Sequence, residues 1–245
     1  MPVIHGRIFH VNVNCSDLET SLAFYRDRVG LTASVRTAPR HPQPGAAFGL
    51  DRVQWDAWIM TAGGGLDEVV VDLLEWKVPG PSRARDPGGF QRLRVGVHPD
   101  APLDSEDVVD PDGTSLEIVA RDRPRVAGVV VGCSDLEASL AFYRDVLGLK
   151  VGFRPDLDFP GYWLYCGEVP VVHLVPRANA IGGGPSDDTG PFDHFAFLAS
   201  DFPGIKANLE KKGVKYRENH IAKPPIDQLF FPDNNNVMVE LNFPR

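Results

Sequence analysis

An internal repeat constrains the fold of this chain more than any other feature of its sequence. Residues 11–31 read VNVNCSDLETSLAFYRDRVGL and residues 129–149 read VVVGCSDLEASLAFYRDVLGL, so sixteen of twenty-one positions are identical at an offset of 118 residues. Self-similarity at a fixed offset is typical of a duplicated structural unit. We therefore expect two related halves, which meet near the charged, proline-containing stretch at residues 121–125.

Both copies of the repeat predict the same local structure. In the first copy a short strand at residues 9–13 precedes a helix whose apolar residues recur at helical spacing and which Gly30 is suited to end. Ser16 and Glu19 fit the S-x-x-E capping box, in which the serine caps the helix and the glutamate bonds back to it. The second copy repeats this pattern 118 residues later.

Strand-like runs follow the helix in each half, so the order strand, helix and three strands is expected four times. One copy is shortened: 25 residues separate Arg92 from Glu117 in the second quarter, whereas 46 separate His194 from Glu240 in the fourth. The missing residues are enough for a helix and a loop. We therefore expect the second module to be truncated.

Composition excludes several classes of partner. The chain has 33 acidic and 25 basic side chains, a formal charge of −8, and no basic stripe for nucleic acid or an anionic membrane. No apolar run reaches the roughly 20 residues of a membrane span. The three cysteines show no disulfide or zinc-finger spacing, so we expect reduced thiols and a cytoplasmic protein. The expected partner is a small molecule, with the oligomeric state left open and a homodimer among the options.

Several stretches carry a family resemblance. They are SDLExSLAFYRDxxGL, found twice, DHFAF at residues 193–197 and NNVMVELNF at residues 235–243. Through them the chain resembles the vicinal oxygen chelate superfamily, which includes glyoxalase I, fosfomycin-resistance proteins, bleomycin-binding proteins and type I extradiol dioxygenases. The resemblance implies paired βαβββ modules that form an incompletely closed, cup-shaped barrel around a divalent metal.

The expected fold class follows from the repeat and the resemblance together. It is α+β, with four tandem βαβββ modules, the second truncated, in two half-barrel domains. We place the domain boundary so that residues 1–122 form a degenerate N-terminal domain and residues 123–245 form a C-terminal domain with the metal site.

Three polar residues lie in the middle of apolar strand segments: His173, His194 and Glu240. A carboxylate buried in such a sheet costs several kcal/mol unless it is paired or bound to a metal. Two imidazoles and a carboxylate suit non-heme Fe(II), and zinc less decisively. The three residues also match three of the four ligand positions that the resemblance implies, the fourth being Gly128. We therefore expect one divalent ion, with Fe(II) favoured and Zn(II), Mn(II) or Ni(II) as alternatives.

The first half offers a different set at the same four positions: His10, Asp72, Arg92 and Glu117. An arginine would repel a cation, so we expect this cup to be free of metal. One alternative stays open, because some members of the superfamily pair modules across halves. That pairing would assemble a full set of four ligands: His10, Asp72, His194 and Glu240.

Four further residues are candidates for the active site. His220 is a candidate general acid or base, although a lone loop histidine is usually solvated. Trp163 and Tyr165 share one strand face and could line a cup for an aromatic substrate, the competing interpretation being an ordinary aromatic core. Gln228 lies near the last strands and is a candidate substrate contact.

These observations favour a divalent-metal-dependent enzyme that acts on a small, oxygen-chelating substrate, including aromatic ones. Dioxygenase-type oxidative chemistry is the favoured reaction. Gly128 departs from the extradiol dioxygenase pattern, which has a histidine on that strand. The alternatives are a glyoxalase-like isomerase or lyase and a non-catalytic protein that binds a small molecule such as an antibiotic.

Overall fold

The structure is a computed structural model that describes residues 3–45, 48–80, 90–101, 107–179 and 189–245. Module 1 comprises β1 (Val3–Asn14), α1 (Leu18–Asp27), β2 (Thr32–Thr37), β3 (Gln43–Pro44), β4 (Arg52–Thr61), the 3₁₀ turn η2 (Leu66–Glu68) and β5 (Val69–Val78). Module 2 comprises β6 (Phe90–Val97), β7 (Asp107–Val109) and β8 (Ser115–Ala120).

The second half repeats this order. Module 3 comprises β9 (Arg125–Cys133), α2 (Leu136–Asp145), β10 (Lys150–Val151), β11 (Tyr162–Cys166), β12 (Val169–Pro176) and the 3₁₀ turn η3 (Arg177–Asn179). Module 4 comprises β13 (Phe192–Ser200), α3 (Phe202–Lys211), β14 (Arg217–Ile221), β15 (Ile226–Pro232) and β16 (Met238–Pro244). The predicted fold class of tandem βαβββ modules is confirmed, and module 2, as far as it is described, has no helix.

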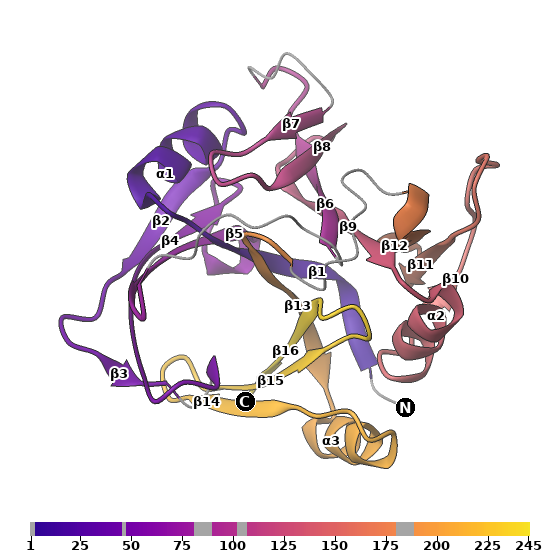
Figure 1. Ribbon diagram of the computed structural model, residues 1–245. Helices are drawn as coiled ribbons and strands as arrows, with labels where there is room; N and C mark the ends of the chain where they lie inside the picture. Colours follow the sequence, from indigo (N-terminus) through magenta and orange to yellow (C-terminus); the bar gives the residue numbers. More distant parts are fainter. Residues whose placement is uncertain (1–2, 46–47, 81–89, 102–106, 180–188) are drawn as a thin grey trace.

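The described strands form two curled sheets, with the three helices at the periphery (Figure 1). One sheet has nine strands in the order β14-β15-β16-β13-β1-β5-β4-β2, and β3 pairs with β4 at its edge. The other has seven strands in the order β10-β11-β12-β9-β6-β8-β7.

The modules pair across the two halves of the chain. In the nine-stranded sheet β1 of module 1 runs antiparallel to β13 of module 4, with Val11 opposite Phe195. In the seven-stranded sheet β6 of module 2 runs antiparallel to β9 of module 3, with Leu93 opposite Val129. The predicted boundary between residues 122 and 123 falls in the turn between β8 and β9, but each sheet contains strands from both sides of it.

Apolar contacts hold the two sheets together. A continuous core of buried residues extends through both sheets. Phe90 at the start of β6 and Phe192 at the start of β13 stack with ring centroids 3.6 Å apart and nearly parallel planes. Their burial fixes the first strand of module 2 against the first strand of module 4, although the two strands belong to different sheets.

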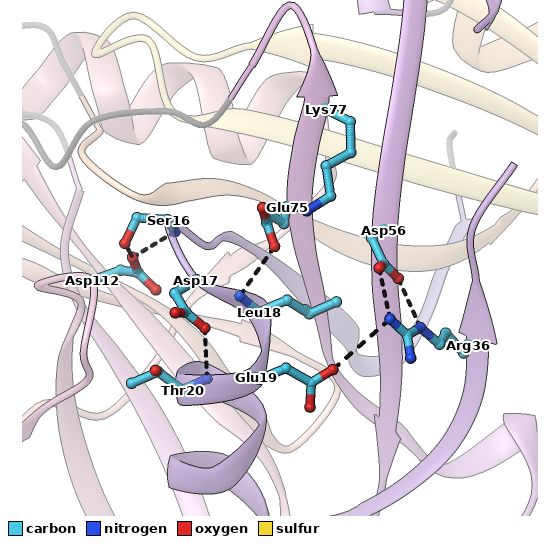
Figure 2. Close-up of polar contacts among 10 residues, drawn as sticks. All are labelled: Ser16, Asp17, Leu18, Glu19, Thr20, Arg36, Asp56, Glu75, Lys77 and Asp112. Atoms are coloured by element: carbon cyan, nitrogen blue, oxygen red, sulfur yellow. Dashed lines mark hydrogen bonds and ion pairs between the residues drawn. The ribbon is translucent and has the colours of Figure 1, made fainter. Parts of the chain in front are cut away.

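The capping box predicted for the first helix is wrong. Asp17 is the N-cap residue, and its carboxylate accepts a hydrogen bond from the Thr20 amide at 3.0 Å. Ser16 lies one residue earlier and donates its amide and its hydroxyl to Asp112, at 2.7 and 2.6 Å (Figure 2). Glu19 points towards Arg36 instead of back to the cap. The second helix has the same arrangement: Asp135 caps it, and Ser134 donates to Asn235.

The start of α1 and the start of α2 are therefore each tied to a turn that precedes the last strand of another module. Within the buried interior the Tyr25 hydroxyl donates to Asp110 at 2.9 Å, and the Tyr143 hydroxyl donates to Asp233 at 2.8 Å. Helix α1 packs on the nine-stranded sheet, whereas Asp110 belongs to the seven-stranded sheet. The second pair crosses between the sheets in the opposite sense, so the two pairs link them twice.

A membrane span was not expected, and in the part of the chain that the structure describes no helix is both long enough and apolar enough to cross a bilayer.

The buried hydroxyl–carboxylate pairs can be tested by removing one oxygen at a time. We expect Tyr25→Phe and Tyr143→Phe each to lower the free energy of unfolding by about 1.5–3 kcal/mol, because a buried carboxylate loses a donor. Tyr162→Phe is the matched control, since its hydroxyl bonds to Glu137 at an exposed position. Urea denaturation measures all three, and equal losses for the buried and exposed tyrosines would contradict the role of the buried pairs.

Candidate metal centre

Three potential ligands converge on one face of the nine-stranded sheet. His10 lies on β1, His194 on β13 and Glu240 on β16. The strand β13 lies between the other two, and its Ala196 faces His10 on one side and Glu240 on the other. Because the methyl group of Ala196 is small, the longer side chains of its two neighbours meet above it.

The donor atoms lie within reach of a single ion. One oxygen of Glu240 is 2.8 Å from Nε2 of His194 and 3.3 Å from Nε2 of His10. One donor atom from each of the three residues lies within 4.8 Å of the other two. Glu240 is only 2% exposed, so its charge requires a partner at this position.

The electrostatics of the cluster couple the histidine to the carboxylate. Burial alone would lower the pKa of His194, but the Glu240 charge and the hydrogen bond with Asp193 outweigh it and raise that pKa to about 10. Burial alone would raise the pKa of Glu240, but His194 and His10 hold it well below its usual range. The site is thus built around a negative charge that faces two imidazole nitrogens.

Surrounding residues fix the orientation of these side chains. Asp193 accepts from Nδ1 of His194 at 2.7 Å, which directs Nε2 towards Glu240. Gln228 donates to the other oxygen of Glu240 and to Asn242, and Asn219 donates to Gln228 at 2.6 Å. Such outer hydrogen bonds orient ligands and tune their basicity in metal sites.

Asp72 on β5 lies near these three residues and interacts with their charges. In the register of the sheet Asn12 lies between Asp72 and His194, and its amide donates to one oxygen of Asp72 at 3.3 Å. The other oxygen is buried and has no hydrogen-bond partner among the described residues, and the same holds for Nδ1 of His10. Burial raises the pKa of Asp72 to about 6, partly offset by His10 and His194. The two imidazoles and the Glu240 carboxylate fit a divalent cation, and Asp72 places a buried, unpartnered oxygen near them.

The structure brings together only two of the three ligands predicted within the second half. His194 and Glu240 meet, but His173 lies on β12 in the seven-stranded sheet. Its place is taken by His10, because module 4 pairs with module 1 and not with module 3. Three of the four residues of the cross-half alternative gather, His10, His194 and Glu240, and the fourth, Asp72, lies in register with Asn12 on the neighbouring strand.

An arginine occupies the corresponding position of the seven-stranded sheet. Arg94 lies opposite Gly128 and beside Glu117 in register, the position that Ala196 has in the other sheet. Its guanidinium donates to Glu117 at 2.9 Å, and Nη1 lies 3.4 Å from Nε2 of His173. Burial and the charges of Arg94 and Arg154 lower the pKa of His173 to about 3. A guanidinium therefore takes the place that a cation would need between these two side chains.

The predicted aromatic residues lie in this second sheet as well. The Trp163 ring stacks on His173 with centroids 4.0 Å apart, and the Tyr165 hydroxyl donates to the Phe153 carbonyl at 2.8 Å. The sheet pairing does not place either beside His194. Of the four further candidates, Gln228 alone contacts the cluster, as a residue that holds Glu240.

His220, the predicted acid or base, is not brought to the cluster either. His220 pairs with Asp227 across the β14–β15 hairpin, next to the pair of Asn219 and Gln228, which faces the cluster. Because neighbouring residues of a strand point to opposite faces, the His220 side chain points away from the cluster. There its ring lies near Phe202 of α3, and its Nδ1 donates to the Asp227 carboxylate at 2.7 Å. This position is exposed on the helix side of the sheet.

Sequence reasoning missed three residues that shape the two sites: Asp193, Asn219 and Arg94. The sequence contained a signal for two of them. Asp193 directly precedes His194 in the DHFAF stretch, and Arg94 lies two residues after Arg92, on the same strand face. Asn219 gave no signal, because its role depends on a contact with Gln228 across a hairpin.

The influence of Arg94 on its neighbour can be measured directly. We expect Arg94→Gln to raise the pKa of His173 from about 3 towards, but not up to, its ordinary value of 6.5, because a positive charge is removed while burial persists. NMR titration of the imidazole resonances gives this pKa. Arg36→Gln, which removes a guanidinium paired with Asp56, is the control and should leave it unchanged. An unaltered value in Arg94→Gln would contradict the contact.

Comparisons with known proteins bear on this arrangement. A solved structure from Bacillus subtilis, described as a "putative dioxygenase", aligns with a TM-score of 0.71 at 14% identity, over 99% of this chain and 86% of that one. Glyoxalase I from Zea mays aligns with a TM-score of 0.65 at 17% identity, over 97% of this chain and 92% of that one. At these identities the likeness establishes the fold alone. A search of curated proteins found no match.

A family model supplies the assignment that these structures leave open. The model of the Glyoxalase/Bleomycin resistance protein/Dioxygenase superfamily matches residues 7–98 and 125–241, which together make up most of the chain. The matched segments include both copies of the repeat and all four residues His10, Asp72, His194 and Glu240. The resemblance stated from the sequence is confirmed, and the chain belongs to the glyoxalase/bleomycin resistance protein/dioxygenase superfamily.

Proposed function

We propose that this protein is a divalent-metal-dependent enzyme that acts on a small substrate with two neighbouring oxygen atoms. The observation that carries the proposal is the buried Glu240 oxygen that faces Nε2 of both His10 and His194. A buried carboxylate with two imidazoles on one sheet face is the donor set of non-heme Fe(II) sites, so Fe(II) is the favoured ion. Zn(II), Mn(II) and Ni(II) are the alternatives.

The residues around the cluster have separable tasks. His10, His194 and Glu240 would hold the ion, which when bound supplies open coordination positions and polarises substrate oxygens as a Lewis acid. Gln228 holds Glu240 in place, and Asp193 holds the ring of His194. Phe230 lies edge-on to His194 with ring centroids 5.7 Å apart and offers an apolar surface beside the donors.

Oxidative cleavage of a catechol-like substrate with O₂ is the reaction that we favour. It is supported by the combination of two histidines and one carboxylate, which leaves several positions free for two substrate oxygens and O₂. The substrate would lie over the polar face of the nine-stranded sheet, since the donors come from β1, β13 and β16.

One observation favours a second candidate, a glyoxalase-like isomerase or lyase. Asp72 has a buried oxygen with no hydrogen-bond partner among the described residues, beside the three donors. This oxygen could accept a proton from a substrate carbon next to a carbonyl and return it to the neighbouring carbon. In that case Asp72 moves a proton, and the three other residues hold the substrate in position through the ion.

Metal content tests the donor set. We expect the purified protein to contain about one divalent ion per chain, and His10→Ala and Glu240→Ala each to lose it, because a two-donor site binds weakly. His173→Ala is the matched control, a buried histidine of the other sheet, and should retain the ion. Elemental analysis by mass spectrometry measures the content. Retention in both site variants, or loss in His173→Ala, would contradict the assignment.

Oxygen uptake separates the two reactions. With Fe(II) bound, we expect the protein to consume O₂ in the presence of catechol, measured with an oxygen electrode, and His194→Ala to consume none. If the protein instead isomerises the hemithioacetal of a 2-oxoaldehyde without O₂, the second candidate is correct. Asp72→Asn should then lower kcat by a factor of about 100 or more while the ion is retained.

A further inference from the structure

A cavity of about 520 Å³ lies where the two halves of the chain meet, apart from the metal centre. Its walls come from β1, from the segment that leads into β5, and from the turn between β8 and β9. Its charged lining residues are Arg7, Glu68, Arg121, Asp122, Arg123 and Arg125. None of His10, Asp72, His194 and Glu240 lines it.

Positive charge predominates in this cavity. Of its two acids, Glu68 is engaged by Arg123 at 2.9 Å. Arg7, Arg121 and Arg125 have no acidic partner in the part of the chain that the structure describes, and the Arg121 guanidinium donates to the Ala120 carbonyl at 2.7 Å. Asp122 is the other acid of the lining. A chain with a formal charge of −8 thus gathers an excess of positive charge at one place.

Two of these arginines lie side by side. Both Arg121 and Arg125 pack over Gly96 on β6, where an added Cβ would come within 2.7 Å of the Cγ atom of Arg121 and 3.3 Å of that of Arg125. The backbone of Arg121 bonds to the Val97 carbonyl, which anchors this end of the turn. Like charges held together repel one another, and an anion placed between them relieves that repulsion.

The rest of the lining suits an organic ligand. Ile8, Val70 and Val126 are buried apolar residues of this lining. The volume lies within the range of small-molecule sites. Guanidinium groups bind phosphate oxygens through paired, charge-assisted hydrogen bonds, which a compact ammonium cannot form.

We infer that this cavity binds a small molecule that carries two or more linked phosphate groups, with Arg7, Arg121 and Arg125 as its contacts. Arg123 is held by Glu68 at the rim. The site stands independently of the proposed reaction, because its residues belong to other positions of the fold.

Calorimetric titration with inorganic pyrophosphate at constant ionic strength tests this inference. We expect saturable binding of one pyrophosphate per chain, with sulfate binding far more weakly. The double variant Arg121→Gln/Arg125→Gln should bind about tenfold more weakly or worse, as expected for the loss of charge-assisted hydrogen bonds. Arg7→Gln, on a different strand, should also weaken binding. This variant tests the inference even if the double variant does not fold.

Two controls separate this site from other sources of binding. Arg40→Gln removes an exposed arginine that does not line the cavity, and it should leave the affinity unchanged. His194→Ala should also bind pyrophosphate as the parent does, whereas loss of binding there would place the anion at the metal centre and overturn the inference. Absence of saturable binding, or an unchanged affinity in both Arg7→Gln and the double variant, would overturn it as well.

Discussion

Two buried hydroxyl–carboxylate hydrogen bonds, Tyr25 to Asp110 and Tyr143 to Asp233, underlie the arrangement of the whole molecule. Each joins a helix that packs on one sheet to a turn that belongs to the other. Both halves of the chain contribute strands to both sheets. The two hydrogen bonds join these sheets in an apolar interior, where an unpaired carboxylate would be costly. The stacked rings of Phe90 and Phe192 support the same junction. This junction positions β1 against β13, and the residues of the candidate metal centre lie on these strands and on β16.

One position differs between the two sheets, and the difference determines whether side chains can meet above it. Ala196 and Arg94 occupy corresponding places between a first strand and a last strand. Above Ala196 there is room for Glu240 to meet His10 and His194, whereas the side chain of Arg94 fills that room and bonds to Glu117 and His173. A small side chain thus leaves an acidic site with two histidines, and a long basic one supplies its own cation. The same architecture yields a candidate reactive centre in one sheet and an internally neutralised cluster in the other.

Much of this could be predicted from the sequence, because the repeat and the alternation of strand residues are local signals. They predicted the modules, the helix in each copy, the truncation of module 2, and the strand faces that carry His194 and Glu240. Which modules pair is a long-range property that alternation does not encode. For this reason the sequence pattern places His173 with His194, although His173 lies in the other sheet. The capping residue was misassigned for a similar reason: the serine that fits the local pattern bonds to Asp112, almost a hundred residues away. The role of Arg94 also depends on a long-range contact, because it becomes visible only when β6 is placed beside β9.

The division of the donors between the halves bears on how a duplicated chain diverges. His10 and Asp72 come from the first copy, and His194 and Glu240 come from the second. Neither half contains the whole candidate donor set, so a substitution in one half alters a site that the other half helps to form. Duplication here has produced mutual dependence in place of redundancy.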